Sequence, residues 1–139
     1  MKISARNQLK GTIEAVTEGA VNGVVTIKVG DALITADITM ASIADLGLAS
    51  GKEAYAVIKA SNVMFATERI AGISARNQLE GTVTKANEGA VNGHVTIELA
   101  DGNTISGSIT NASIEDLGLA IGKPAVAIVK STDVMVAVD

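Results

Sequence analysis

The chain has 139 residues, 47% of them apolar, with one Tyr, one Phe and no Trp, so its core must be aliphatic. No Cys and one His exclude disulfides, cysteine nucleophiles and zinc sites built on thiolates or histidines. A formal net charge of −4 with so few aromatic rings argues against nucleic acid as a partner. No apolar run reaches the roughly 20 residues that cross a bilayer, and the start has no signal-peptide pattern. We therefore expect a cytoplasmic protein without a membrane partner.

The first part of the chain predicts three strands. Apolar and polar residues alternate over residues 9–15, as a half-buried strand requires. Apolar residues again fill every second position over 25–29 and 34–38, most of them β-branched. Gly30-Asp31 stands between these last two segments and predicts a tight turn.

A short helical turn and two more strands are expected next. Ser42-Ile43-Ala44-Asp45 has the S-x-x-D form of a capping box, and Gly47 supplies a natural stop. Apolar residues over 54–59 and 63–66 predict a fourth strand and a short fifth. Five strands with one helical turn indicate a small all-β, OB-like Greek-key barrel.

The whole unit is repeated. Residues 3–9 recur unchanged at 73–79, and Glu18-Gly19-Ala20-Val21-Asn22-Gly23 recurs at 88–93. We predict two tandem OB-like five-stranded barrels, at residues 1–68 and 72–139. The short joint between them indicates that they pack together. Such small cores cannot bury all the apolar residues, so we also expect a homo-oligomer.

Few basic residues keep their place in both copies. The matching pairs are Arg6 with Arg76, Lys52 with Lys123, and Lys59 with Lys130. Hydroxyl side chains stand close to the first and last of these pairs. A tetrahedral dianion accepts hydrogen bonds only, so its site needs N–H and O–H donors, cationic charge and no carboxylate. Gly-Ala-Val-Asn-Gly adds a bend where backbone N–H groups can converge on an anion.

Five motifs in this order resemble the molbindin family, whose Mop-type domains bind molybdate or tungstate. They are Ser-Ala-Arg-Asn-Gln, Gly-Ala-Val-Asn, Ile-Thr-x-x-Ser, Leu-Gly-Leu-x-x-Gly-Lys, and Lys-x-Ser/Thr-x-Val-Met. The resemblance spans essentially the whole chain. It implies OB-like barrels that assemble into rings, with trimers for two-domain chains. It also implies a molybdate or tungstate ligand and no cofactor.

Two kinds of oxyanion site follow from the resemblance. The first joins the Ser-Ala-Arg and Lys-x-Ser segments to an Ile-Thr segment of a neighbouring domain. Its residues are Ser4, Ala5, Arg6, Thr39, Lys59 and Ser61, and in the second copy Ser74, Ala75, Arg76, Thr110, Lys130, Ser131 and Thr132. The second kind uses backbone near the symmetry axis, at Gly19, Ala20, Val21, Asn22, Gly89, Ala90, Val91 and Asn92. Met40 stands where the second copy has Asn111.

Structural roles compete with binding at several of these positions. Surface or interface ion pairs are the alternative for Arg6 and Arg76. A solvated strand end is the alternative for Lys59 and Lys130. Thr39 and Thr110 fit a strand as well as a site. Helix capping explains Ser42 and Ser113 better than binding does. We also expect Lys52 and Lys123 in solvent, Met64 and Met135 in the core, and His94 in a structural or exposed position.

The sequence predicts reversible oxyanion binding for molybdenum storage, homeostasis or delivery, by a protein that is not an enzyme. The alternative is a molybdate-sensing module that regulates a protein partner. A hydrolase or transferase lacks support, because there is no Cys, no duplicated His and no recurring carboxylate pair beside Ser-Ala-Arg.

Overall fold

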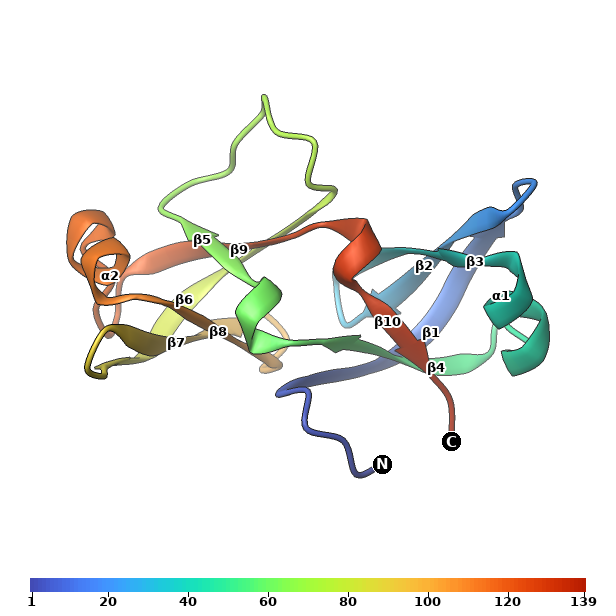
Figure 1. The fold of residues 1–139 in the computed structure, drawn as a ribbon, viewed down its shortest axis with the longest axis horizontal. Coiled ribbons are helices and arrows are strands. Elements are labelled where there is room, and N and C mark those ends of the chain that lie inside the picture. Colours follow the sequence, from blue (N-terminus) through green and yellow to red (C-terminus); the bar gives the residue numbers. More distant parts are fainter.

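A computed structural model describes all 139 residues and shows two similar halves side by side along the long axis (Figure 1). The first half contains β1 (Asn7–Thr17), β2 (Asn22–Val29), β3 (Ala32–Thr39), α1 (Met40–Leu46), β4 (Glu53–Ile58), η1 (Ala60–Asn62) and β5 (Met64–Ala66). The second contains β6 (Asn77–Glu88), β7 (Asn92–Leu99), β8 (Thr104–Thr110), α2 (Asn111–Leu117), β9 (Pro124–Val129), η2 (Ser131–Asp133) and β10 (Met135–Ala137). The α-helices lie at opposite ends of the molecule, and neither has the length to span a membrane.

The last strand of each half belongs to the sheet of the other half. One sheet has the order β10-β4-β1-β2-β3 and the second has β5-β9-β6-β7-β8. Met64 of β5 lies opposite Ile128, and Met135 of β10 lies opposite Val57. The expected fifth strand over 63–66 therefore exists, but it does not complete the barrel of its own copy. The sequence repeat is contiguous, whereas each five-stranded sheet is not.

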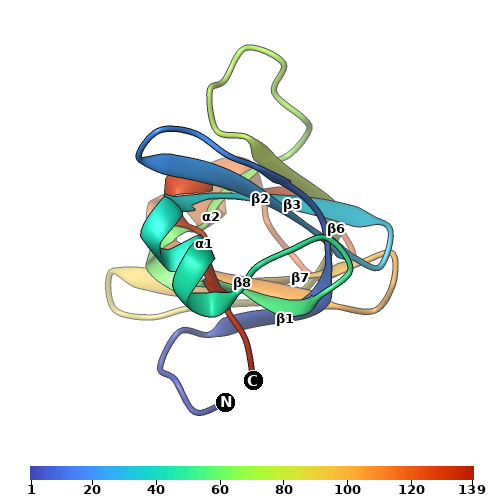
Figure 2. The ribbon, with the colours of Figure 1, turned by 90° about the vertical axis from the view of Figure 1, so that its right-hand side faces the viewer.

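The larger of two apolar core clusters spans both halves. It contains 25 buried residues, all Val, Ile, Leu or Ala, and both sequence copies contribute to it. The close packing expected from the short joint is confirmed. Viewed along the long axis, the curled sheets of the two halves lie one behind the other, with both chain ends on the same side (Figure 2).

The turn between β2 and β3 forms where it was expected. Val29 pairs with Ala32, which leaves only Gly30 and Asp31 in the loop. Gly30 has a φ of 59°, at the position where a type II′ turn requires glycine. The second copy has a longer loop after Leu99, whose N–H donates to the carbonyl of Asn103 (2.8 Å).

The N-cap of each helix is a threonine, not the serine expected from the capping-box pattern. Thr39 has an extended backbone, and its hydroxyl oxygen accepts from the N–H of Ser42 (3.1 Å). Thr110 and Ser113 repeat this arrangement in α2. The stop at Gly47 is confirmed, because its φ of 61° places it in the left-handed region that ends helices.

Candidate functional site

A pocket of about 490 Å³ lies where the chain enters β1 and leaves β4. Eight residues line it: Ile3, Ser4, Ala5, Arg6, Lys59, Ala60, Ser61 and Met135. The structure thus brings together five of the six residues expected at the first-copy site. Thr39 is the sixth, and it lies beyond the opposite end of the 11-residue strand β1.

The pairing of β1 with β4 explains why Arg6 and Lys59 meet. Asn7 lies opposite Ile58 at the end of this antiparallel ladder. The residues one step outward on the two strands are Arg6 and Lys59. Antiparallel neighbours lie about 5 Å apart, so the two cations emerge side by side. The η1 turn that follows Lys59 then carries Ser61 back to the same opening.

The pocket presents hydrogen-bond donors and positive charge without acidic side chains. No Asp or Glu lines it. The only ion pair in the structure joins Lys10 to Glu53 (3.8 Å) on the surface. Arg6 and Arg76 therefore form no ion pair within the chain, and ion pairs with a second chain stay the alternative. Arg6 and Lys59 are both exposed and have no carboxylate partner, which suits a ligand that only accepts hydrogen bonds.

One wall of the pocket comes from the other half of the chain. Met135 belongs to the exchanged strand β10 and lines the opening beside the cations. Met64 and Met135 are 42% and 40% exposed, so the expectation that they fill the core is wrong. The sequence missed Met135 as a lining residue because nothing in the repeat signals the strand exchange. Ile3 and Ala60 were also missed, although both flank residues that were predicted.

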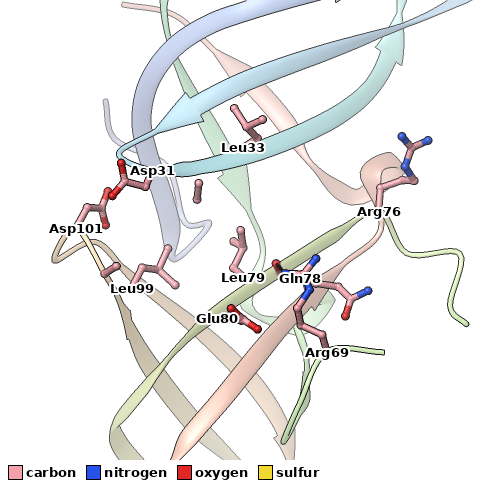
Figure 3. A pocket seen from close by; sticks show the side chains of 11 residues that line it. Asp31, Leu33, Arg69, Arg76, Gln78, Leu79, Glu80, Leu99 and Asp101 are labelled. Atoms are coloured by element: carbon pink, nitrogen blue, oxygen red, sulfur yellow. Dashed lines mark hydrogen bonds between the residues drawn. The ribbon is translucent and has the colours of Figure 1, made fainter. Parts of the chain in front are cut away.

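In the second copy the strand pairing recurs, but Arg76 lines a pocket of different composition. Asn77 lies opposite Val129, so Arg76 and Lys130 again stand at neighbouring strand ends. Arg76, however, lines a pocket of about 430 Å³ between the halves, together with Arg69 and Gln78. Three carboxylates share this opening, and Figure 3 shows the Arg76 guanidinium turned away from all of them. The acidic residues are Asp31, Glu80 and Asp101.

The remaining second-copy residues lie near the same strand ends. Ser74 is exposed and Ala75 is 6% exposed, just before β6. Lys130 follows β9 and is exposed, while Ser131 and Thr132 lie in η2. Thr110 is at the distant end of β8 and caps α2.

The two Gly-Ala-Val-Asn loops form the tips of the β1–β2 and β6–β7 hairpins. Val21 and Val91 are 74% and 72% exposed, and their carbonyls accept from the N–H groups of Met40 and Asn111 (both 2.8 Å). Asn111 adds a side-chain bond to the Gly89 carbonyl (2.8 Å). No residue in either loop has a positive φ. The loops therefore lack the alternating right- and left-handed backbone of an anion nest.

His94 and the remaining lysines are exposed. His94 lies on β7 opposite Ser108, in agreement with an exposed role. Lys52 is exposed as expected, and its Nζ also donates to the carbonyl of Leu46 (2.7 Å) at the end of α1. A cation at this end of a helix interacts favourably with its terminal carbonyls.

Two small OB-like barrels with exchanged strands and an acid-free basic pocket define a tandem binding module. The chain belongs to the TOBE domain family, whose model matches residues 3–65 and 73–136. The resemblance to Mop-type domains and the OB-like all-β fold, both expected from the sequence, are confirmed.

Several relatives carry molybdenum-related names. The chain is 43% identical over 139 residues to the molybdenum transport protein ModE of Azotobacter vinelandii, covering 99% of this chain and 52% of ModE. It is 42% identical over 139 residues to the molybdenum-pterin-binding protein MopA of Rhodobacter capsulatus, with the same coverage. The chain therefore spans about half the length of these curated relatives.

Smaller relatives and a solved structure match as well. Molybdenum-pterin-binding protein 2 of Clostridium pasteurianum is 48% identical over 64 residues, 46% of this chain and 94% of that protein. A crystal structure of the cytoplasmic molybdate-binding protein ModG with molybdate bound superposes with a TM-score of 0.96. Its identity is 44%, and the match covers 100% of both chains.

Proposed function

We propose that this chain binds molybdate or tungstate reversibly in the cytoplasm, for storage, homeostasis or delivery of molybdenum. The observation that carries the proposal is the acid-free pocket formed by Ser4, Ala5, Arg6, Lys59 and Ser61. A tetrahedral dianion fits such a donor set because all its oxygens accept hydrogen bonds. The full-length match to molybdate-bound ModG supports the choice of ion. Binding makes and breaks no covalent bond, so the proposal includes no catalysis and no cofactor.

A homo-oligomer, most simply a trimer, would complete the sites. Thr39 ends β3, near the opposite end of the sheet from Arg6, and so cannot reach the Arg6 pocket of its own half. A neighbouring chain would have to supply this threonine if it is a ligand. Exposed Val21, Val91 and Ile121 give the chain apolar surface that such contacts would cover. Two further groups of binding positions are proposed. One is the backbone of 19–22 and 89–92. The other is the second-copy set of Ser74, Ala75, Arg76, Thr110, Lys130, Ser131 and Thr132.

Titration calorimetry with molybdate in a sulfate-containing buffer tests the proposal. The native chain is compared with Arg6→Ala and with Lys28→Ala, which removes one positive charge away from both pockets. Lys28 is a suitable control because its side chain is exposed on β2 and is not among the proposed binding positions. We expect Arg6→Ala to weaken binding at its sites by about tenfold or more, since a charge-assisted hydrogen bond is lost. Absence of binding by the native chain, or equal loss in both variants, would overturn the proposal.

A molybdate-sensing module is the second candidate. It is favoured by the match to ModE, of which this chain spans about half. A pull-down with and without molybdate separates the two candidates. Capture of a protein partner that depends on molybdate supports a sensor. A high stoichiometry of bound ion with no partner supports a store.

A further inference from the structure

Asn7 is a buried side chain placed directly between the pocket and the other half of the chain. It is the first residue of β1, follows Arg6 in the sequence and is 3% exposed. A carboxamide buried to this extent is costly unless its donors and acceptor are paired. The partners of Asn7 are all backbone groups. Its Nδ2 donates to the carbonyls of Ile58 (3.1 Å) and Ser106 (2.8 Å), and its Oδ1 accepts from the Ser106 N–H (2.7 Å).

These bonds connect three elements that form or support the pocket. Ile58 ends β4 and directly precedes Lys59. The bond from Asn7 to the Ile58 carbonyl therefore links the residue after Arg6 to the residue before Lys59. Ser106 lies on β8, the edge strand of the opposite sheet. Asn7 pairs with both backbone groups of Ser106, as a neighbouring strand would. The η1 turn that carries Ser61 also packs against β8.

We propose that Asn7 is a positioning residue that sets the spacing of Arg6 and Lys59 around the bound oxyanion. It does so by fastening both strand ends to the edge of β8. The inference rests on the proposed function of the pocket and extends it. Asn7 does not line the opening, so it acts through the two cations and not by contact with the ion.

The second copy provides a matched control within the same chain. Asn77 follows Arg76, is 2% exposed and pairs with the N–H (2.7 Å) and the carbonyl (2.8 Å) of Thr35 on the edge strand β3. It makes no bond to Val129, the counterpart of Ile58. Asn77 thus shares the anchoring contact of Asn7 and lacks the link to the strand end that carries the lysine.

The test compares Asn7→Leu with Asn77→Leu in the full chain. Both variants leave one N–H and one carbonyl of an edge strand unpaired, which should lower the Tm by about 5 °C. Asn7→Leu also loses the bond to the Ile58 carbonyl, so its Tm should fall somewhat further. In molybdate calorimetry, Asn7→Leu should weaken by about tenfold the same sites that Arg6→Ala weakens, in line with residues that orient the ligands of a bound ion. Asn77→Leu should leave those sites unchanged. Equal effects of the two variants on these sites would show a structural role only and overturn the inference.

Amide hydrogen exchange of the ligand-free protein gives an independent readout. Asn7→Leu should increase exchange over residues 59–62, whereas Asn77→Leu should increase it near Thr35 and leave 130–132 unchanged. Unaltered exchange over 59–62 in Asn7→Leu would overturn the inference. If the native chain binds no molybdate, the proposed function fails and this comparison still tests the positioning role. The pair Asn7→Ser and Asn77→Ser, which leaves room for a water, replaces the leucine pair if those variants do not fold.

Discussion

Phe65 on β5 lies directly against Gly107 on β8, so that a Cβ on Gly107 would come within 2.5 Å of the Phe65 ring. The two equivalent residues in the other half differ less in side-chain size. Val136 on β10 corresponds to Phe65, since the two lie opposite Ala56 and Ala127 in their sheets. Ala36 on β3 corresponds to Gly107. The sizes of the two residues thus compensate within each pair. Phe65 faces a glycine, whereas the smaller Val136 corresponds to a position with an alanine.

Gly107→Ala should destabilise the protein by about 1–3 kcal/mol, because the added methyl group overpacks the contact with the ring. Phe65→Val should also destabilise it by leaving a cavity. The double variant reproduces the Val–Ala combination of the other half and should recover most of the loss. Urea unfolding of the four proteins measures the coupling free energy. Strictly additive effects would show that the two residues do not constrain each other.

Thr39→Ala should cost about 1 kcal/mol of stability, because the N–H of Ser42 loses its capping acceptor. Thr39→Ser keeps the hydroxyl and should cost much less. Ser42→Ala should also cost less than Thr39→Ala, since the Ser42 hydroxyl accepts from Thr39 Oγ1 and caps no backbone group. Thermal unfolding of these three variants ranks the losses. A larger loss in Ser42→Ala than in Thr39→Ala would restore the serine-cap interpretation of the sequence.

Arg6→Ala should reduce molybdate binding more than Arg76→Ala does. Arg76 lines an opening that also contains Asp31, Glu80 and Asp101, and carboxylates repel a dianion. The Arg6 pocket contains none. Calorimetry on the two single variants measures this difference, with both losing one positive charge. Equal losses would mean that the oligomer makes the two sites equivalent.

The sequence predicted the strands, the helical turn and the cation pair at the ends of β1 and β4. Alternation over residues 9–15 and the glycines at 30 and 47 are local signals. They were sufficient to predict the first strand, the tight turn and the end of the helical turn. The recurrence of an Arg and a Lys at matching places in both copies had no local explanation. The antiparallel register between Asn7 and Ile58 accounts for it in the first copy.

The strand exchange was beyond the reach of the sequence. The segments 63–66 and 134–137 have similar apolar character, so either can fill the edge of either sheet with the same pattern buried. The choice depends on contacts between the halves, such as Phe65 with Gly107. The anchoring role of Asn7 was missed for the same reason. Its partner Ser106 is 99 residues away in the sequence.

A fragment of residues 1–70 tests whether the unit 1–68 is also a unit of folding. In the intact chain, the edge of β4 is covered by β10 from the other copy, and β5 pairs outside its own half. A monomeric fragment would leave the edge of β4 uncovered and β5 without a strand partner. We therefore expect two fragments to exchange β5 reciprocally and form a dimer that repeats the arrangement of the intact chain. Sedimentation equilibrium, with circular dichroism to confirm β structure, measures this. A folded monomer would show that β5 can close its own barrel and that the linker of the intact chain directs the exchange.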